Sequence, residues 1–268
     1  MENLRHFFGL KKDPFSQNVA VRDLYPLPAL APLKQRVSFA VQQKALTVIT
    51  GDVGAGKSTS LRYMAHQFQT SEYQIISLIG GQYSLMELYR QILLSFGIEF
   101  SSYQITFMIK MIREKIQEIA SRNVTPIMII DEAHLFKHNV FSQLHTLLQF
   151  EYDSKPVMPV VLCGQDGLMD HLMTSAARPL ASRVLGKNHL ESIKREVMEE
   201  YLNHHLALAG LKKPIFAENA VYAIHQKSGG ILRRANSLAK AAMLVAAMER
   251  KDFVSAEHVR VAATELIL

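Results

Sequence analysis

The sequence predicts an α/β fold, in which helices cover both faces of a parallel β-sheet, followed by a smaller domain built only of helices. The first observation is that short apolar runs alternate along the chain with segments whose apolar residues recur at helical spacing. The second is a change near residue 189, after which helical segments follow one another without a further convincing strand. Strands that alternate with helices are typical of a parallel sheet covered on both faces. We therefore expect one domain over residues 1–188 and a helical lid domain over residues 189–268.

The elements follow from these patterns in chain order. The apolar runs predict strands at residues 46–49, 74–78, 126–130 and 157–163. The helical pattern predicts helices at residues 3–9, 32–43, 59–70, 85–96, 107–122 and 140–152, and then at 191–209, 219–226, 231–249 and 256–267. Aromatic residues are expected to pack the N-terminal segment onto the sheet domain; they are Phe7, Phe8, Phe15 and Tyr25. A contact between Tyr25 and an adenine base is the less favoured alternative.

Composition restricts the class of protein. A chain of 268 residues can hold one large domain and one small one. Cys163 is the only cysteine, so no intrachain disulfide can form, and a cytoplasmic location is expected. No apolar run approaches the roughly 18 residues that cross a bilayer, and the N-terminus has no secretion signal pattern. The net charge of +6 is compatible with nucleic acid or anionic lipid but diagnostic of neither.

A phosphate-binding loop follows the first strand. The stretch consists of Gly51, Asp52, Val53, Gly54, Ala55, Gly56, Lys57, Ser58 and Thr59, and it matches the pattern G-x-x-x-x-G-K-[ST]. The glycines let the backbone turn tightly and direct its N–H groups at an oxyanion, and the following helix adds its positive dipole end. Lys57 is expected to reach the β- and γ-phosphates of ATP, and the Ser58 hydroxyl to hold Mg²⁺.

Polar residues follow two of the later strands. Asp131 at the end of the strand at 126–130 can hold Mg²⁺, usually through water, and Glu132 beside it can act as the general base. The alternative is that the two carboxylates only begin the next helix. Gln165, after the strand at 157–163, can position the attacking water near the γ-phosphate; an ordinary loop glutamine is the competing interpretation.

Four arginines are candidates for contacts with phosphate. Arg178 and Arg183 are placed to meet the nucleotide of a neighbouring subunit, a role in which one arginine can raise the rate about 10³–10⁵-fold. We favour Arg183, with solvation at the surface as the alternative for both. In the lid, Arg233 is assigned to the nucleotide, and contact with nucleic-acid phosphate is the competing use. Arg234 is left open.

This set of motifs resembles the AAA+ ATPase superfamily of P-loop NTPases and, more narrowly, the group similar to the general secretion pathway protein A, ExeA. The similarity extends over nearly the whole chain, from Phe7-Phe8-Gly9-Leu10 through the DEAH sequence at 131–134 and Cys163-Gly164-Gln165 to Ser228-Gly229-Gly230-Ile231-Leu232-Arg233-Arg234. It implies that Lys57 and Ser58 are the Walker A pair, Asp131 and Glu132 Walker B, Gln165 sensor 1 and Arg183 the arginine finger. That family usually has proline where this chain has Leu232, which weakens the transfer of a sensor role to Arg233.

The resemblance also implies a function. Secretion members of the group carry a membrane segment and a cell-wall-binding region after the ATPase body, whereas this sequence ends directly after the expected lid. It looks more like the helper ATPases of transposons, of the TniB and TnsC type, and the B protein of phage Mu. That implies homo-oligomers, rings or helical filaments, which form on duplex DNA with ATP and Mg²⁺, mark a target site and stimulate a transposase, without a membrane. The alternatives are a secretion or envelope-assembly ATPase without a DNA role, and a switch that binds ATP and barely hydrolyses it.

Overall fold

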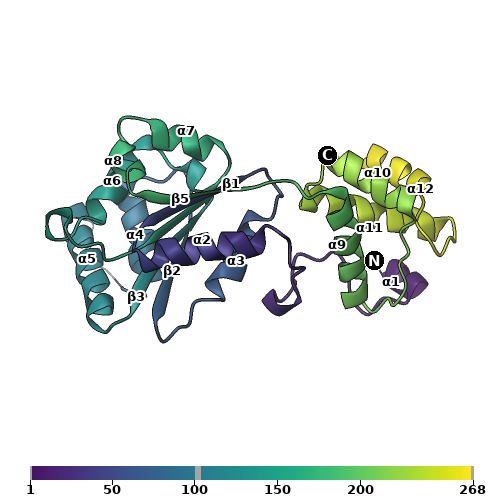
Figure 1. Ribbon diagram of the computed structural model, residues 1–268, viewed down its shortest axis with the longest axis horizontal. Helices are drawn as coiled ribbons and strands as arrows, with labels where there is room; N and C mark the ends of the chain where they lie inside the picture. The colour runs from purple at the N-terminus through teal and green to yellow at the C-terminus, as the bar shows by residue number, and fades with distance from the viewer. Residues whose placement is uncertain (1, 100–103, 267–268) are drawn as a thin grey trace. The chain divides into compact units, whose positions relative to one another are not determined.

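The computed structural model describes residues 2–99 and 104–266, which form two compact units (Figure 1). The sheet unit contains Pro28–Gly51 and Lys57–Leu190. The helical unit contains Met1–Leu27, Asp52–Gly56 and Glu191–Leu268. Among the described residues, no helix combines the length and the apolar character that crossing a bilayer requires.

The sheet unit is built on five parallel strands. They are β1 (Leu46–Gly51), β2 (Tyr73–Ile79), β3 (Thr125–Asp131), β4 (Val160–Gly164) and β5 (Val184–Leu190). Their order across the sheet is β2-β3-β4-β1-β5, and every neighbouring pair is parallel. The predicted α/β fold with a parallel sheet is therefore confirmed.

Strand β5 was not among the strands predicted from the sequence, and it ends at Leu190, where the helical pattern was expected to begin. Exposed and buried residues mix along this edge strand, and its sequence includes Gly186, Lys187 and Asn188 in place of a continuous apolar run. Asn188 is buried, and its amide lies 3.4 Å from the backbone oxygen of Val48 on β1. Pairing with β1 thus makes a strand of a segment whose own composition does not predict one.

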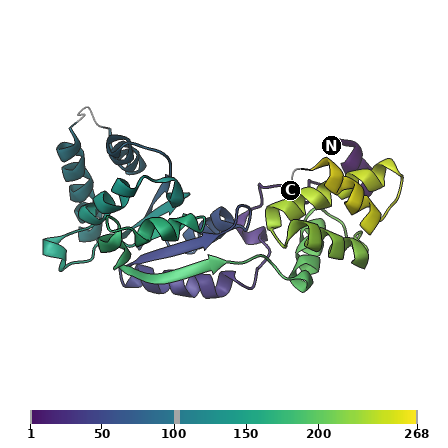
Figure 2. The same ribbon diagram turned by 90° about the horizontal axis from the view of Figure 1, so that it is seen from above.

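Helices pack against both faces of this sheet, as expected (Figure 2). One face is covered by α4 (Leu85–Ser95), α5 (Ile105–Ser121), α6 (His138–Leu147), α7 (Gly167–Met173) and α8 (Arg178–Ala181). Its core includes alternate strand residues such as Val48, Met128 and Leu162. The other face is covered by α2 (Leu30–Gln42) and α3 (Lys57–Ala65), and there the intervening residues Ile49 and Cys163 are buried. Side chains point alternately to the two faces of a strand, so a strand buried on both sides reads as an unbroken apolar run.

The register brings the carboxyl ends of three strands to one edge of the sheet. Thr50 on β1 lies opposite Gly164, the last residue of β4. Ile130 on β3, one residue before Asp131, lies opposite Leu162 on β4. In open parallel sheets the functional groups gather at this edge. The last residues of β1, β3 and β4 therefore become neighbours although they are far apart in the sequence.

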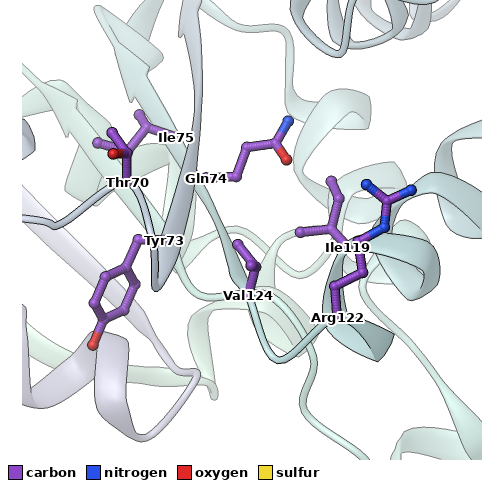
Figure 3. A pocket seen from close by; sticks show the side chains of 7 residues that line it. All are labelled: Thr70, Tyr73, Gln74, Ile75, Ile119, Arg122 and Val124. Atoms are coloured by element: carbon purple, nitrogen blue, oxygen red, sulfur yellow. The ribbon is translucent and has the colours of Figure 1, made fainter.

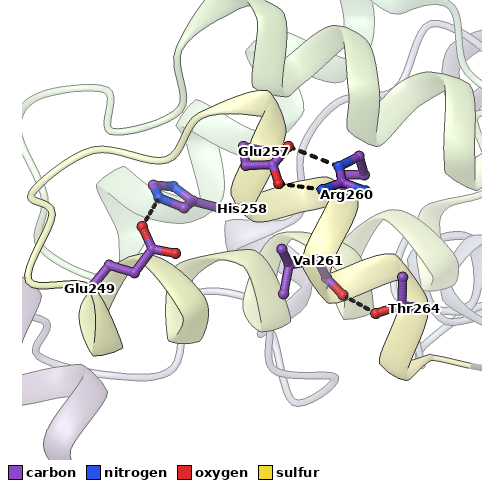
Figure 4. A network of polar contacts seen from close by, with 6 residues as sticks. All are labelled: Glu249, Glu257, His258, Arg260, Val261 and Thr264. Carbon is purple, nitrogen blue, oxygen red and sulfur yellow. Dashed lines mark hydrogen bonds and ion pairs between the residues drawn. The ribbon is translucent and has the colours of Figure 1, made fainter.

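The helical unit holds a second core. It contains α1 (Glu2–Phe8), α9 (Arg195–Leu208), α10 (Glu218–Ser228), α11 (Leu232–Met248) and α12 (Ala256–Glu265). The predicted helix at 256–267 thus ends at Glu265 in the structure, and Ile267 lies outside the described residues. The start of α12 is held by His258, whose Nδ1 accepts the Ser255 N–H at 3.0 Å and whose Nε2 lies 3.1 Å from a Glu249 carboxylate oxygen (Figure 4).

The N-terminal segment packs with these helices, which corrects the expected packing on the sheet domain. Phe8 and Phe15 are buried in the core of the helical unit, and Tyr25 packs against that core while its hydroxyl donates to Glu200 at 2.5 Å. Phe7 remains 39 % exposed. The apolar faces of α9 and α11 offer these rings a complementary surface, which single-segment patterns do not reveal. The predicted domains, 1–188 and 189–268, remain a proposal, and the compact units depart from them in residues 1–27.

Candidate nucleotide-binding site

The phosphate loop has a backbone that requires its glycines. Gly54 and Gly56 have φ angles of +89° and +98°, in a region that residues with a side chain rarely adopt. Directly after the loop, α3 begins at Lys57, whose side chain is only 6 % exposed. The Lys57 ammonium donates to the backbone oxygen of Gly51 at 2.9 Å. The sheet unit therefore holds this cation at the carboxyl end of β1, where the phosphate prediction requires it.

Within the helical unit, the first turn of α11 lies against residues of the same loop. The Arg233 N–H donates to the backbone oxygen of Gly54 at 3.2 Å. A Cβ atom on Gly54 would come within 2.7 Å of the Arg233 Cβ, so glycine is also required by this contact. The structure thus brings Arg233 next to the predicted phosphate loop through its backbone, while its side chain is exposed.

The acidic pair lies at the tip of β3. Glu132 has φ 52° and ψ 33°, a left-handed conformation that is rare for a residue with a side chain. Its N–H donates to the Asp131 carboxylate at 2.9 Å. Gly80, directly after β2, donates its N–H to the backbone oxygen of Asp131 at 2.6 Å. A Cβ on Gly80 would come within 2.2 Å of the Glu132 backbone oxygen, so any other residue here would have to displace the backbone at the tip of β3.

His134 connects the tips of β3 and β4. Its Nδ1 lies 3.4 Å from a carboxylate oxygen of Glu132 and 3.4 Å from the backbone nitrogen of Gln165. The predicted water-positioning residue therefore lies beside the predicted general base, with the imidazole between them. Sequence analysis assigned roles to neither His134 nor Gly80. In the sequence, His134 is marked only as the last residue of the DEAH sequence, and Gly80 only as the first of two glycines after the second strand.

Cys163 is buried in the same region, on the β4 strand next to β3. Burial raises the pKa of its thiol, and the nearby Asp131 carboxylate raises it further. The thiol therefore stays protonated at neutral pH, and its place beside Asp131 is that of a small core side chain.

Arg183, the favoured candidate for the arginine finger, lies at the other end of β1. Arg183 directly precedes β5, and its backbone oxygen accepts the Leu46 N–H at the amino end of β1. The length of β1, about 17 Å, separates that end from Gly51. Arg178 begins α8 and is exposed. The structure thus places the Arg183 backbone at the amino end of β1, and a role of either arginine at a nucleotide stays a prediction.

A separate cavity of about 340 Å³ lies at the amino end of β2, away from this edge (Figure 3). Its lining side chains come from β2 and the residues before it, and from the end of α5 and the residues after it. They are Thr70, Tyr73, Gln74, Ile75, Ile119, Arg122 and Val124. Since the acidic pair lies at the opposite end of the strands, this cavity is not part of the predicted nucleotide site.

The residues at the carboxyl edge fit a nucleoside triphosphate and a divalent cation. The loop supplies a glycine-dependent turn and a buried ammonium, and Ser58 and Asp131 supply the hydroxyl and carboxylate oxygens that Mg²⁺ prefers. A strand that leads through such a loop into a helix, with an acidic strand tip on the same sheet, defines the class of P-loop NTPases. Among these proteins, the similarity is more specific: residues 40–172 match the family model of an AAA domain.

Comparisons with known proteins agree with this match. The chain is 28 % identical over 242 residues to the general secretion pathway protein A of Aeromonas hydrophila, an alignment that covers 90 % of this chain and 44 % of that protein. The chain thus spans less than half the length of this relative. Two solved structures share the fold. Cdc6p from Pyrobaculum aerophilum has a TM-score of 0.76 at 16 % identity, covering 97 % of this chain and 72 % of that one. The Aeropyrum pernix ORC1 protein in complex with DNA has a TM-score of 0.68 at 14 % identity, covering 96 % and 69 %.

Proposed function

We propose that this protein is a cytoplasmic ATPase that binds ATP with Mg²⁺, forms homo-oligomers on duplex DNA and regulates DNA transposition by acting on a transposase. The observation that carries the ATPase part is the arrangement at the carboxyl edge of the sheet. There the buried Lys57 follows the glycine loop, and the strained Glu132 lies between Asp131 and His134.

Each of these residues has a role in the proposed reaction. The loop from Gly51 to Thr59 binds the triphosphate through its N–H groups, and Lys57 neutralises the β- and γ-phosphates. Ser58 and Asp131 would hold Mg²⁺, which offsets negative charge on the phosphates when it is bound. Glu132 accepts a proton from the attacking water at its carboxylate, and Gln165 orients that water.

Two arginines, Arg183 and Arg233, are proposed to make hydrolysis depend on assembly of the oligomer. Arg183 of one copy is proposed to stabilise the charge that develops on the nucleotide of the next copy. Arg233, whose backbone contacts the loop, is proposed to respond to the nucleotide from the helical unit. Occupancy by ATP would then favour the oligomer, and hydrolysis would release it.

The DNA part of the proposal is supported by the fold and the net charge of +6. The ORC1 structure that shares this fold contains DNA. The use in transposition is supported by the resemblance to transposon helper ATPases. If the proposal is correct, an ATP analogue promotes binding to duplex DNA, with affinity that falls steeply as salt rises. Electron microscopy then shows rings or filaments with DNA and nucleotide together. Absence of DNA binding at low salt contradicts this part.

A second candidate is favoured by the identity to the general secretion pathway protein A. In that function the ATPase would act on an envelope-assembly partner, without DNA. Co-purification with an inner-membrane protein, combined with no DNA binding in the presence of ATP analogue, would select it over the first.

Two substitutions test the nucleotide site itself. Lys57→Ala removes the buried ammonium, so tight ATP binding should be lost; unchanged affinity would contradict the phosphate assignment. Glu132→Gln keeps the shape but removes the base, so ATP should still bind while turnover falls by about 10²–10⁴-fold. Undiminished turnover of this variant would remove Glu132 from the proposed role.

A further inference from the structure

Two lysine pairs from opposite ends of the chain lie together on the helical unit. Lys11 and Lys12 follow α1, and Lys212 and Lys213 follow α9. The Lys11 N–H donates to the backbone oxygen of Ala209 at 2.8 Å. The Lys11 side chain then runs over Gly210, where a Cβ would meet its Cγ at 3.0 Å and its Cε at 3.5 Å.

The two lysine pairs lie close together because Lys11 contacts Gly210, and Lys212 and Lys213 follow Gly210 by only two and three residues. Consecutive Cα atoms are about 3.8 Å apart, so Lys212 and Lys213 lie within about 8–11 Å of Gly210. The four side chains can therefore reach one stretch of a partner. We define Lys11, Lys12, Lys212 and Lys213 as the lysine patch.

The segment that carries the first pair is fixed to the helices. The buried His205 donates from Nδ1 to the backbone oxygen of Pro14 at 3.0 Å. Asp13 forms an ion pair with Lys240 on α11, and the side chain of Phe15 is buried in the core. The lysine patch is thus held in place by the folded unit, which lowers the entropy lost when a partner binds.

The charge of the patch is not neutralised within the chain. All four lysines are exposed, and across residues 2–99 and 104–266 none of their ammonium groups forms an ion pair. Asp13, the nearest carboxylate along the sequence, is already paired with Lys240. Four positive charges therefore face solvent together.

The chemistry of the patch suits a phosphate backbone. Lysine is a compact, strongly hydrated charge on a flexible stem and contacts phosphate oxygens without reading bases. The residues directly next to the two pairs are Leu10, Asp13, Leu211 and Pro214, so neither pair alternates with aromatic side chains as a surface that stacks single-stranded bases would. A duplex presents regularly spaced phosphates along its strands.

We propose that the lysine patch binds the phosphate backbone of duplex DNA. This inference rests on the proposed function and identifies the DNA-contacting surface within it. It gives the N-terminal segment a binding role besides its role in the core, and it predicts affinity without sequence preference.

The test removes the four charges together, as Lys11→Gln, Lys12→Gln, Lys212→Gln and Lys213→Gln in one variant. Fluorescence anisotropy measures its affinity for a labelled duplex with ATP analogue, over a range of salt concentrations. Each phosphate contact contributes about 0.9 to the slope of log affinity against log salt, so the slope should become shallower by about 3 to 4. The affinity at about 0.1 M salt should fall at least tenfold.

A matched control removes the same number of positive charges from the sheet unit. It replaces Lys44, Lys110, Lys155 and Lys187, all exposed, with glutamine. This variant should keep most of the affinity and the wild-type salt slope, and both variants should bind ATP analogue normally, which reports correct folding. An equal loss in both variants would show a general charge effect and overturn the inference.

The remaining outcomes separate the inference from the function on which it rests. If the wild-type protein does not bind DNA at low salt, the proposed function fails. If the wild-type protein binds and the patch variant binds equally well with the same slope, only the patch assignment fails. If the variant keeps DNA binding but loses binding to vesicles with anionic phospholipid, the patch serves a membrane surface and the inference is wrong.

Discussion

At the scale of single residues, Glu132 is held in a conformation that costs about 1–2 kcal/mol for an L-residue. Two neighbours compensate for it: the Asp131 carboxylate accepts the Glu132 N–H, and Gly80 leaves room for the Glu132 carbonyl. Local strain of this kind persists where the surrounding structure over-determines it, and such positions cluster at functional sites. The proposed general base therefore has a backbone geometry set by its surroundings.

His134 is expected to position this base. It lies 3.4 Å from both the Glu132 carboxylate and the Gln165 backbone nitrogen, so its removal leaves the carboxylate less restrained. We predict that His134→Ala lowers kcat for ATP by about ten- to a hundredfold, since small misplacements of catalytic groups are costly, and leaves ATP affinity nearly unchanged. Steady-state kinetics together with equilibrium nucleotide binding would separate the two effects.

The control for this prediction is His138→Ala. His138 is exposed at the start of α6, and its ring is tilted against that of His171, with ring centroids 4.6 Å apart. Its replacement should leave kcat close to wild type. An equal loss of activity in both variants, or a loss of ATP binding in His134→Ala, would refute a positioning role for His134.

His205 should make the helical unit sensitive to acid. Burial lowers its pKa to about 4, and the nearby charges of His204 and Lys12 act in the same direction. In the unfolded chain a histidine titrates near 6.5, so between about pH 6.5 and 4 the unfolded state binds more protons and folding stability falls as pH falls. The expected loss is on the order of 3 kcal/mol by pH 4.

Urea unfolding of wild type and His205→Asn at several pH values checks this expectation. Asparagine can still donate to the Pro14 carbonyl but does not titrate. The difference in stability between the two proteins should therefore shrink or change sign as pH falls from 7 to 4.5. A constant difference over that range would contradict the buried neutral imidazole.

At the scale of elements, the turn after β2 supports the tip of β3. A methyl group on Gly80 would have to displace the Glu132 carbonyl, because the clash of 2.2 Å is with backbone atoms that have no alternative rotamer. We predict that Gly80→Ala destabilises the protein by about 1–3 kcal/mol and lowers ATP turnover more than ATP binding. Thermal unfolding and kinetics would measure the two effects.

Gly167 provides the comparison for this substitution. It begins α7, and a Cβ there would meet nothing within 4 Å. Gly167→Ala should be neutral or slightly stabilising because alanine favours helix. Comparable losses in the two variants would show that the close contact at Gly80 does not matter.

At the scale of the whole molecule, the ATPase should depend on assembly. Arg183 lies at the amino edge of the sheet, one strand length from the phosphate loop of its own chain. We predict that activity per subunit rises with protein concentration in wild type, and that Arg183→Ala abolishes this rise without changing ATP affinity.

The outcome for Arg178→Ala decides between the two candidate fingers. If Arg178→Ala loses the concentration-dependent activity while Arg183→Ala keeps it, Arg178 takes the role. Mixing Arg183→Ala with Lys57→Ala subunits gives an additional test. An intact loop in one copy and an intact arginine in the other should restore part of the activity when both copies meet in one oligomer.

An element could be predicted from the sequence when its own residues show the pattern of burial, and it was missed when it depends on a partner elsewhere in the chain. Strands β1, β3 and β4 were predicted because burial on both faces requires continuous apolar runs. Strand β2 was predicted from a shorter apolar run, although part of it is exposed. Strand β5 was missed because its polar residues, Asn188 among them, are compatible with a strand only beside β1. The packing of Phe8 and Phe15 was assigned to the wrong unit because an aromatic side chain indicates burial without indicating its partner.

The sequence by itself determined the parallel α/β class and the phosphate loop, since both depend on residues that are close together in the chain. It also named Asp131, Glu132 and Gln165 as candidates, because each directly follows an apolar run. Only the tertiary structure showed that His134 lies between Glu132 and Gln165 and that Gly80 is packed against the Glu132 backbone. Only the tertiary structure also brought the two lysine pairs to one place on the helical unit. These arrangements come from strand register and helix packing, which join segments that no local pattern connects.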